Sequence, residues 1–143
     1  MITAFIDANV LFAAALSPRG ASHEILRQSV RGNVSLISSK YVIEEAKRNL
    51  AAKYPEALPV LFELLEALDL TLINPTKEQV VASAVYTELK DAPVVAAARQ
   101  AQVDYLVTLD RRHLLNVPEV AQQSGLNIIL PGQLLEALQE NTR

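Results

Sequence analysis

Four acidic side chains stand where the sequence could bring carboxylates together. Asp7 ends the apolar run "ITAFID", Asp110 ends "YLVTLD", Asp91 opens "DAPVVAAA", and Glu45 lies within "YVIEEAKRNL". Carboxylates about 5 Å apart repel by roughly 3 kcal/mol per pair at an effective dielectric constant near 20. Such a group is costly unless a cation lies within it. With oxygen ligands alone, it suits Mg²⁺ or Mn²⁺.

Each acid taken alone has a simpler interpretation. Asp7, Asp91 and Asp110 all stand where a helix would begin, and an aspartate there is a common helix cap. Pro93, in the first turn after Asp91, is typical of a helix start. Glu45 is equally compatible with an ordinary position at the boundary of a helix. The metal hypothesis therefore depends on the four acids acting together.

The second acid must be chosen between two neighbours, Glu44 and Glu45. At 100° per residue, Val42, Ala46 and Leu50 define the apolar face of this predicted helix. Glu44 lies nearly opposite that face, whereas Glu45 falls on its flank. We therefore predict Glu45 as the inward-reaching acid and keep Glu44 as the alternative.

Apolar runs rich in β-branched residues alternate with runs of helical periodicity. Alternating strands and helices indicate a parallel sheet covered on both faces. The sequence predicts one α/β domain over residues 1–143, a three-layer α/β/α sandwich with a central parallel sheet of about five short strands. The predicted strands are 2–7, 34–38, 70–74, 105–109 and 127–130, and the predicted helices are 22–31, 39–54, 59–68, 77–89, 92–102 and 132–140.

This architecture separates the two aspartates that bracket "YLVTL". In an open parallel sheet, sites form at the carboxyl ends of the strands. Asp104 precedes its strand and Asp110 follows it, so at ~3.3 Å per residue they are roughly 20 Å apart. Only Asp110 lies at the functional edge, and we predict Asp104 to be a solvated residue at the strand start.

Composition narrows the class of protein. A chain of 143 residues that is 50% apolar is about the size of one domain with one core. No apolar run approaches the ~18 residues of a membrane span, and Asp7 interrupts any signal-like stretch, so we expect a soluble, cytoplasmic protein without membrane contact. There is no cysteine, and His23 and His113 are far apart, which argues against zinc. Both histidines are predicted to be structural, although His113 lies near enough to Asp110 for a general acid.

The net charge of -3 at first argues against a nucleic-acid partner. If four carboxylates belong to a metal site, however, 12 acidic residues remain against 13 basic ones. The rest of the chain then has a net charge of +1, which would not repel RNA. Several basic residues lie within a few positions of the predicted site: Lys47, Arg48, Lys90, Arg99, Arg111 and Arg112.

In order and spacing, the four acids resemble those of the PIN-domain ribonuclease family. Asp7 in "IDANVL", Glu45 in "YVIEEAKRNL", Asp91 in "KDAPVVAAA" and Asp110 in "VTLDRRHLL" match the family's first to fourth acids. Thr108 matches the usual polar residue two positions before the last acid. The segment "IDANVLFAAALSPRGASHEIL" is especially similar to the VapC-like toxins of type II toxin-antitoxin pairs.

The resemblance implies a Mg²⁺- or Mn²⁺-dependent ribonuclease that hydrolyses phosphodiester bonds and leaves a 5′-phosphate. The four acids would be the catalytic metal ligands, with Asn9 and Thr108 placed behind them to orient carboxylates or water. It also implies an antitoxin protein as partner and a homodimer, for which the apolar helix at 58–68 offers an interface.

Three other classes compete with a nuclease. A haloacid-dehalogenase-type phosphatase needs a second aspartate where Asn9 stands. A Rossmann-like nucleotide binder needs a glycine-rich turn after the first strand, which the four glycines of the chain do not supply. The serious alternative is a non-catalytic PIN fold that binds protein or RNA. Against it, a binding module has no reason to keep mutually repelling carboxylates together.

Overall fold

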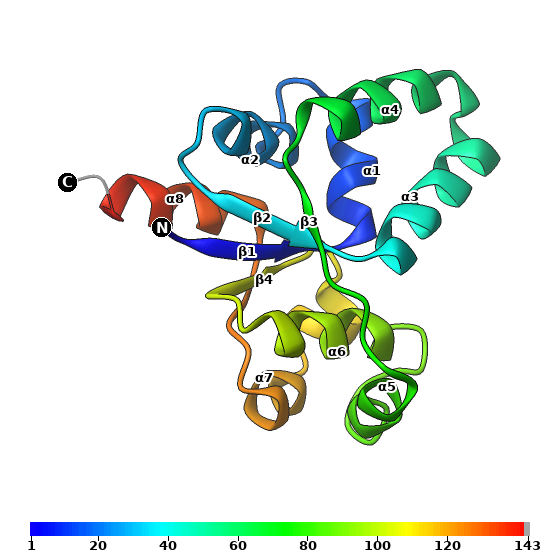
Figure 1. Cartoon of the computed structure of the whole chain (residues 1–143), viewed down its shortest axis with the longest axis vertical. Coiled ribbons are helices and arrows are strands. Elements are labelled where there is room, and N and C mark those ends of the chain that lie inside the picture. The colour runs from blue at the N-terminus through cyan, green and yellow to red at the C-terminus, as the bar shows by residue number, and fades with distance from the viewer. Residues whose placement is uncertain (142–143) are drawn as a thin grey trace.

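The computed structural model describes residues 1–141, in which one parallel sheet lies between two layers of helices (Figure 1). In chain order, the elements are β1 (Thr3–Ile6), α1 (Ala8–Leu16), α2 (Ala21–Val30), β2 (Ser35–Ser38), α3 (Lys40–Lys53), the 3-10 turn η1 (Pro55–Ala57), α4 (Leu58–Ala67), β3 (Thr71–Leu72), α5 (Lys77–Ser83), α6 (Ala92–Ala101), β4 (Tyr105–Val107), the π-helical turn η2 (Arg111–Leu115), α7 (Pro118–Ser124), β5 (Ile128–Ile129) and α8 (Pro131–Asn141).

The five strands are all parallel and lie in the order β3-β2-β1-β4-β5. Helices α1 to α4 cover one face of the sheet and α5 to α7 the other (Figure 1), while α8 packs against α2 and β4. The predicted three-layer α/β/α sandwich with a five-stranded parallel sheet is confirmed. The strand order reverses between β1 and β4, and ligands of such sheets bind at that switch point, outside the carboxyl ends of the strands.

The central strands β1 and β4 are mostly apolar because helices cover both of their faces. Phe5 and Ile6 of β1 and Leu106 and Val107 of β4 are fully buried. At the edge of the sheet, by contrast, β3 has only two residues and both are exposed. The most constrained part of the sheet is therefore the β1–β4 pair, which makes it a rigid base for residues that come directly after these strands.

The predicted helix at 77–89 is wrong in its second half. Helix α5 ends at Ser83, and turns occupy the chain from there to Asp91. Val85 and Leu89 are more than four-fifths exposed, so this stretch has no buried face to stabilise a helix. Helix α7 was not predicted, since its seven residues are too few to show a clear period. Among the described helices, none is long and apolar enough to cross a membrane.

Candidate metal centre

The backbone places Asp7 and Asp110 at the same edge of the sheet. Strands β1 and β4 pair in register with Ile6 opposite Val107, and the Asp7 amide donates a 3.0 Å hydrogen bond to the Val107 carbonyl. Residues directly after two paired parallel strands emerge side by side. Each aspartate also caps the helical segment after it: Asp7 accepts from the Ala8 amide at 2.7 Å, and Asp110 accepts from the His113 amide at 3.0 Å. The cap interpretation of each is thus correct, but incomplete.

Thr108 links these two aspartates through one buried hydroxyl. Its Oγ1 donates to Oδ2 of Asp7 at 2.8 Å and accepts from the Asp110 amide at 3.1 Å. Asn9 donates from Nδ2 to the same hydroxyl oxygen at 3.3 Å, and its Oδ1 accepts from the Leu109 amide at 3.0 Å. Thr108 and Asn9, the two predicted orienting residues, are therefore both part of one hydrogen-bond network with Asp7 and the Asp110 backbone. This network fixes the position of the Asp7 carboxylate relative to the backbone at Asp110.

Asp91 comes to the carboxyl edge of β1 and β4 from the start of α6, in the helical layer on the other face of the sheet from α1. It stands at the start of α6, yet its side chain makes no capping hydrogen bond, unlike those of Asp7 and Asp110. The residue is 7% exposed, and its Oδ2 is buried without a hydrogen-bond partner among the described residues. An ionised oxygen left in this way costs several kcal/mol. A bound cation would supply the missing partner.

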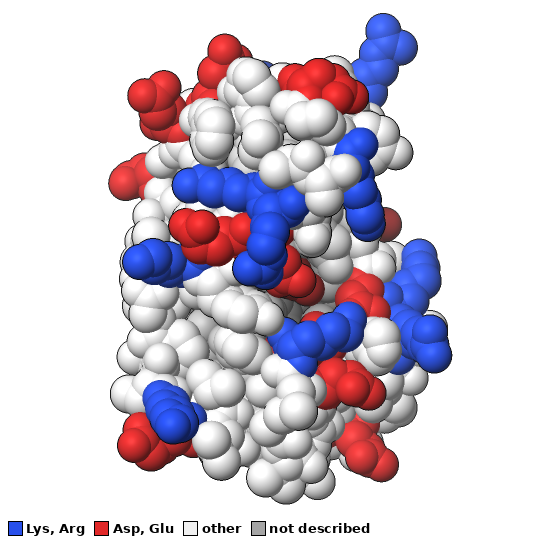
Figure 2. All heavy atoms as spheres, turned by 90° about the vertical axis from the view of Figure 1, so that its right-hand side faces the viewer, with Lys and Arg blue, Asp and Glu red and all other residues white. Residues whose placement is uncertain are grey.

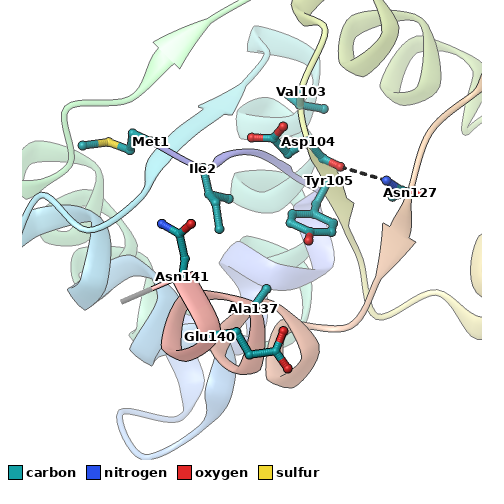
Figure 3. Close-up of a pocket in the computed structure, with 9 residues that line it drawn as sticks. All are labelled: Met1, Ile2, Val103, Asp104, Tyr105, Asn127, Ala137, Glu140 and Asn141. Carbon is teal, nitrogen blue, oxygen red and sulfur yellow. Dashed lines mark hydrogen bonds between the residues drawn. The ribbon is translucent and has the colours of Figure 1, made fainter. Parts of the chain in front are cut away.

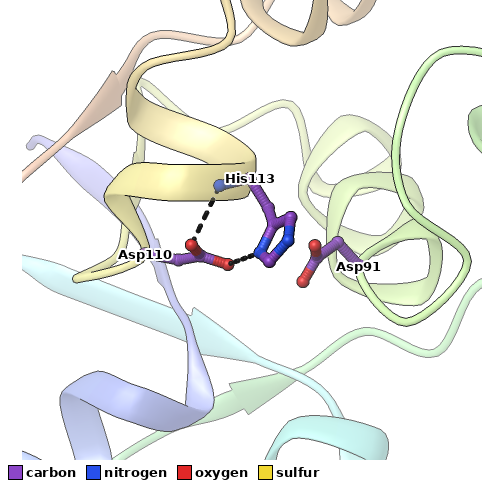
Figure 4. A group of neighbouring side chains, drawn as sticks. All are labelled: Asp91, Asp110 and His113. Atoms are coloured by element: carbon purple, nitrogen blue, oxygen red, sulfur yellow. Dashed lines mark hydrogen bonds and ion pairs between the residues drawn. The ribbon is translucent and has the colours of Figure 1, made fainter.

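Asp91, Asp110 and His113 form a compact cluster in which one ligand atom of each lies within 4.8 Å of the others (Figure 4). Asp7 and Glu45 lie outside this cluster, but the charge of Asp7 helps to raise the pKa of both Asp91 and Glu45. Burial raises the pKa of Asp7, and the charge of Asp110 raises it further. The structure therefore brings Asp7, Asp91 and Asp110 together at the carboxyl edge of β1 and β4.

Glu44 and Glu45 differ in burial, as their positions on the two sides of α3 predict. Glu44 is exposed, whereas Glu45 is half-buried on the flank of the Val42–Ala46–Leu50 face. Burial raises the pKa of Glu45, and the negative charge of Asp7 adds to this effect. Of the two glutamates, Glu45 is therefore the one whose carboxylate lies near Asp7.

The acids at this edge of the sheet are desolvated and lie close enough to raise one another's pKa. Burial raises the pKa of Asp91 to about 6, against the opposing field of Lys90 and with the charges of Asp110 and Asp7 adding to the shift. Desolvated carboxylates that repel one another are held together at a cost, which a divalent cation would offset. The oxygen-rich donor set and the unpartnered Oδ2 of Asp91 therefore fit Mg²⁺ or Mn²⁺.

Two further residues lie at this site, and neither was assigned a specific role from the sequence. The ammonium group of Lys90 is 3.8 Å from Oδ2 of Asp110. The Tyr41 hydroxyl donates to the Lys90 carbonyl at 3.0 Å, which ties α3 to the loop before α6. Burial and the charge of Glu45 raise the pKa of Tyr41. For Tyr41 the sequence offered its four-residue spacing from Glu45, which places both on one helix face, and for Lys90 its position directly before Asp91.

Asp104 lies at the other end of β4, as predicted, but it is more than a solvated residue. Its Oδ2 accepts a 2.8 Å hydrogen bond from the Thr3 amide and so ties the start of β4 to β1. It lines a cavity of about 730 Å³ at the amino ends of the strands, together with Asn127 and Glu140 (Figure 3). Asp104 is therefore outside the candidate metal centre.

The face at the carboxyl ends of the strands carries both signs of charge (Figure 2). Acidic groups lie in the middle of this face, and several Lys and Arg side chains flank them. A negatively charged polymer would meet basic side chains there as it approached a metal-loaded acidic centre.

We expect Thr108→Val to lower any metal-dependent activity of this site by about 10- to 100-fold, the range found when a group that orients a metal ligand is removed. Valine has nearly the shape of threonine but cannot donate to Asp7. It would also leave the Asp110 amide without its acceptor. Thr108→Ser, which keeps the hydroxyl, is the matched control and should retain most of the activity. Equal losses in the two variants, measured as kcat/KM, would exclude an orienting role for the hydroxyl.

Comparison with known proteins gives a family model and a set of similar folds. The model described as PIN domain matches residues 3–112. No curated protein matches the sequence. PAE2754 of Pyrobaculum aerophilum is 21% identical over 97% of this chain and 96% of its own, with a TM-score of 0.68. The structure of VapBC2 of Rickettsia felis, bound to a DNA fragment from the promoter, gives 13% identity, coverages of 90% and 98%, and a TM-score of 0.64. VapC20 of Mycobacterium tuberculosis, a sarcin-ricin loop cleaving toxin, is 12% identical over 76% of this chain and 91% of its own, with a TM-score of 0.53. Because all three structures are at most 21% identical to this chain, their similarity shows a shared fold and nothing further.

Proposed function

Because this chain belongs to the PIN-domain family, we propose that it is a metal-dependent ribonuclease that hydrolyses RNA phosphodiester bonds with Mg²⁺ or Mn²⁺. The observation that carries the proposal is the carboxylate of Asp91. It is buried beside Asp110, has one oxygen without a hydrogen-bond partner among residues 1–141, and does not serve its own helix as a cap. Neither a structural role nor a simple binding surface explains why that charge is kept there.

In the proposed mechanism, Asp7, Glu45, Asp91 and Asp110 hold one or two ions at the carboxyl edge of the sheet. When bound, such an ion would supply activation of water and neutralisation of charge at the phosphate, and hydrolysis of the P–O3′ bond would leave a 5′-phosphate on one product and a 3′-hydroxyl on the other. Thr108 and Asn9 hold the carboxylate of Asp7 through the hydroxyl of Thr108. This preorganisation matters because a site that must rearrange for each turnover loses part of its rate.

Lys90 is suited to contact the RNA. Its ammonium group lies at the mouth of the site, 3.8 Å from Asp110, with the side chain mostly exposed. Lysine is a mobile point charge and a common ligand of phosphate. The 3.8 Å separation is long for an ion pair, and the Lys90 side of the pair faces solvent, so Lys90 can leave Asp110 for a phosphate oxygen at little cost.

We further propose that the protein is the toxin of a toxin-antitoxin pair and acts as one domain in the cytoplasm. The fold is shared with VapC20, described as a sarcin-ricin loop cleaving toxin, and with VapBC2. An antitoxin would reach the site by presenting a cationic side chain to the acids. We also propose that the protein forms a homodimer through α4, where Val60 and Phe62 are exposed apolar side chains.

We expect the purified protein to cleave a mixed RNA substrate in Mg²⁺ or Mn²⁺, to lose this activity in EDTA, and to lose it again in Asp7→Asn. Asparagine keeps the size of the side chain but removes a charge that the ion needs. Products are read on a denaturing gel, and their 5′ ends by phosphatase-dependent labelling. Expression of the wild-type chain should arrest growth, and expression of Asp7→Asn should not.

Full activity of Asp7→Asn would overturn the assignment of the site. Absence of cleavage, together with calorimetry that shows no binding of either ion, would favour the alternative, a non-catalytic PIN-fold module that binds protein or RNA. In that case the wild-type chain and Asp7→Asn should retain the same partners.

A further inference from the structure

We propose that His113 supplies a nitrogen ligand to the ion held by Asp91 and Asp110, and that this imidazole makes the site select first-row transition-metal ions over Mg²⁺. The inference rests on the proposed function only in assuming that a divalent ion occupies the site. It concerns a residue outside the four acids, and the sequence favoured a structural role for it.

The backbone of η2 brings the imidazole back over the preceding aspartate. The His113 amide donates to Oδ1 of Asp110 at 3.0 Å, and Nδ1 of its ring lies 3.3 Å from Oδ2 of the same carboxylate. Single π-helical turns are rare and occur frequently at functional sites. In Figure 4 the ring lies between the carboxylates of Asp110 and Asp91. The position of His113 is thus fixed by contacts with one proposed ligand and directed towards another.

The spacing of these groups suits a shared ion. One ligand atom from each of Asp91, Asp110 and His113 lies within 4.8 Å of the others, close to the separation of ligands across an ion with bonds of about 2.0–2.2 Å. The second, independent observation is the buried Oδ2 of Asp91, which has no hydrogen-bond partner among residues 1–141. A hydrogen bond between His113 and Asp110 does not satisfy that oxygen, whereas an ion within the cluster would.

Oδ2 of Asp110 makes only long contacts with the nitrogen groups around it. Oδ2 of Asp110 faces two nitrogen groups, Nδ1 of His113 at 3.3 Å and Nζ of Lys90 at 3.8 Å, and both are longer than a strong charged hydrogen bond. Neither nitrogen lies at about 2.8 Å, although the side chain of Lys90 is 58% exposed. Such an oxygen is available to an ion without the loss of a strong contact.

An imidazole ligand changes which ion the site prefers. Mg²⁺ favours an all-oxygen octahedral shell and keeps several of its waters. Along the first transition row, affinity for mixed nitrogen and oxygen ligands rises from Mn²⁺ through Co²⁺. Two carboxylates and one imidazole therefore discriminate against Mg²⁺ to a degree that four carboxylates alone would not.

The test compares Mn²⁺, Co²⁺ and Mg²⁺ binding by calorimetry in the wild-type protein, in His113→Gln, and in His23→Gln as control. His23 is the other histidine of the chain, and its ring contacts the Ala14 carbonyl at 3.0 Å, away from the site. We expect His113→Gln to weaken Mn²⁺ and Co²⁺ binding by about 10-fold or more while Mg²⁺ binding changes far less. His23→Gln should leave all three affinities unchanged.

A second measurement needs no activity. Electron spin echo spectra of the Mn²⁺-bound wild-type protein should show modulation from a directly bound nitrogen, and His113→Gln should lose it. Absence of that modulation in the wild-type protein, or an equal loss of Mg²⁺ and Mn²⁺ affinity in His113→Gln, would overturn the inference. RNA cleavage by the same wild-type preparation would then leave the proposed nuclease intact. Failure to bind any of the three ions would overturn both.

Discussion

Replacing Asp91 by asparagine is expected to reduce RNA cleavage by about 100-fold or more and, at the same time, to stabilise the metal-free protein. The activity falls because a ligand of an ion that supplies several kcal/mol of transition-state stabilisation is removed. Stability rises because, in the absence of the ion, Oδ2 of Asp91 is a buried charge without a hydrogen-bond partner in the described part of the chain. Loss of function with a gain of stability is the pattern expected of a residue kept for its chemistry.

The gain in stability should depend on pH with a definite sign. Burial raises the pKa of Asp91 in the folded protein from 3.8 to about 6, so between these values the folded state binds more protons than the unfolded state. Stability of the wild type therefore falls as pH rises through this window. The difference in Tm between Asp91→Asn and the wild type should be near zero below about pH 4 and largest above about pH 6. A shift of this size corresponds to about 3 kcal/mol at most.

The control for this prediction is Asp104→Asn. Asp104 lies at the opposite end of β4, where it bonds to Thr3, so its replacement should leave cleavage unchanged. Added Mn²⁺ or Mg²⁺ should raise the Tm of the wild type and of Asp104→Asn, but much less that of Asp91→Asn. Full nuclease activity of Asp91→Asn, or a Tm difference that does not vary with pH, would contradict the prediction.

The second large effect is expected from a pair of neighbouring variants, Glu45→Gln and Glu44→Gln. Both remove one negative charge from α3 and preserve side-chain size, so they differ only in helix face. Glu45 is half-buried, and the charge of Asp7 helps to raise its pKa, whereas Glu44 is exposed. We expect Glu45→Gln to lower kcat/KM by about 100-fold, since a charged group near the ion contributes a few kcal/mol. Glu44→Gln should stay within about twofold of the wild type.

The result separates the two candidates for the second acid. Calorimetry should give weaker metal binding for Glu45→Gln and unchanged binding for Glu44→Gln. If Glu44→Gln is instead the inactive variant, α3 must turn in the metal-bound protein so that its other flank faces the site. Wild-type activity in both variants would reduce the centre to the three aspartates.

The sequence alone was enough to predict the layers of the fold, because each depends on a local period. β-Branched runs predicted all five strands to within a few residues at each end, and the spacing of Val42, Ala46 and Leu50 placed Glu45 rather than Glu44 on the inner flank. The rule that sites lie at the carboxyl ends of parallel strands then separated Asp110 from Asp104. These inferences need only the side-chain directions that helix and strand geometry impose.

The features that the sequence did not reveal depend on contacts between distant segments. The end of α5 at Ser83 was missed because whether Val85 and Leu89 find a buried partner is decided by the packing of the whole layer. The contact of Tyr41 with Lys90 joins residues 49 positions apart. No local period encodes such a pair.

The tertiary structure also decided the character of the site itself. The sequence predicted Asp91 as a metal ligand only in combination with the other acids, since taken alone it was better explained as a helix cap, and it predicted a structural role for His113. Only the fold shows that, within residues 1–141, the side chain of Asp91 makes no capping hydrogen bond and its buried Oδ2 has no partner, and that a π-helical turn brings His113 beside it. Local sequence thus determined which residues stand at the edge of the sheet. The packing of one helical layer against the other determined which of them meet, because burial and charge repulsion arise only when distant segments are brought together.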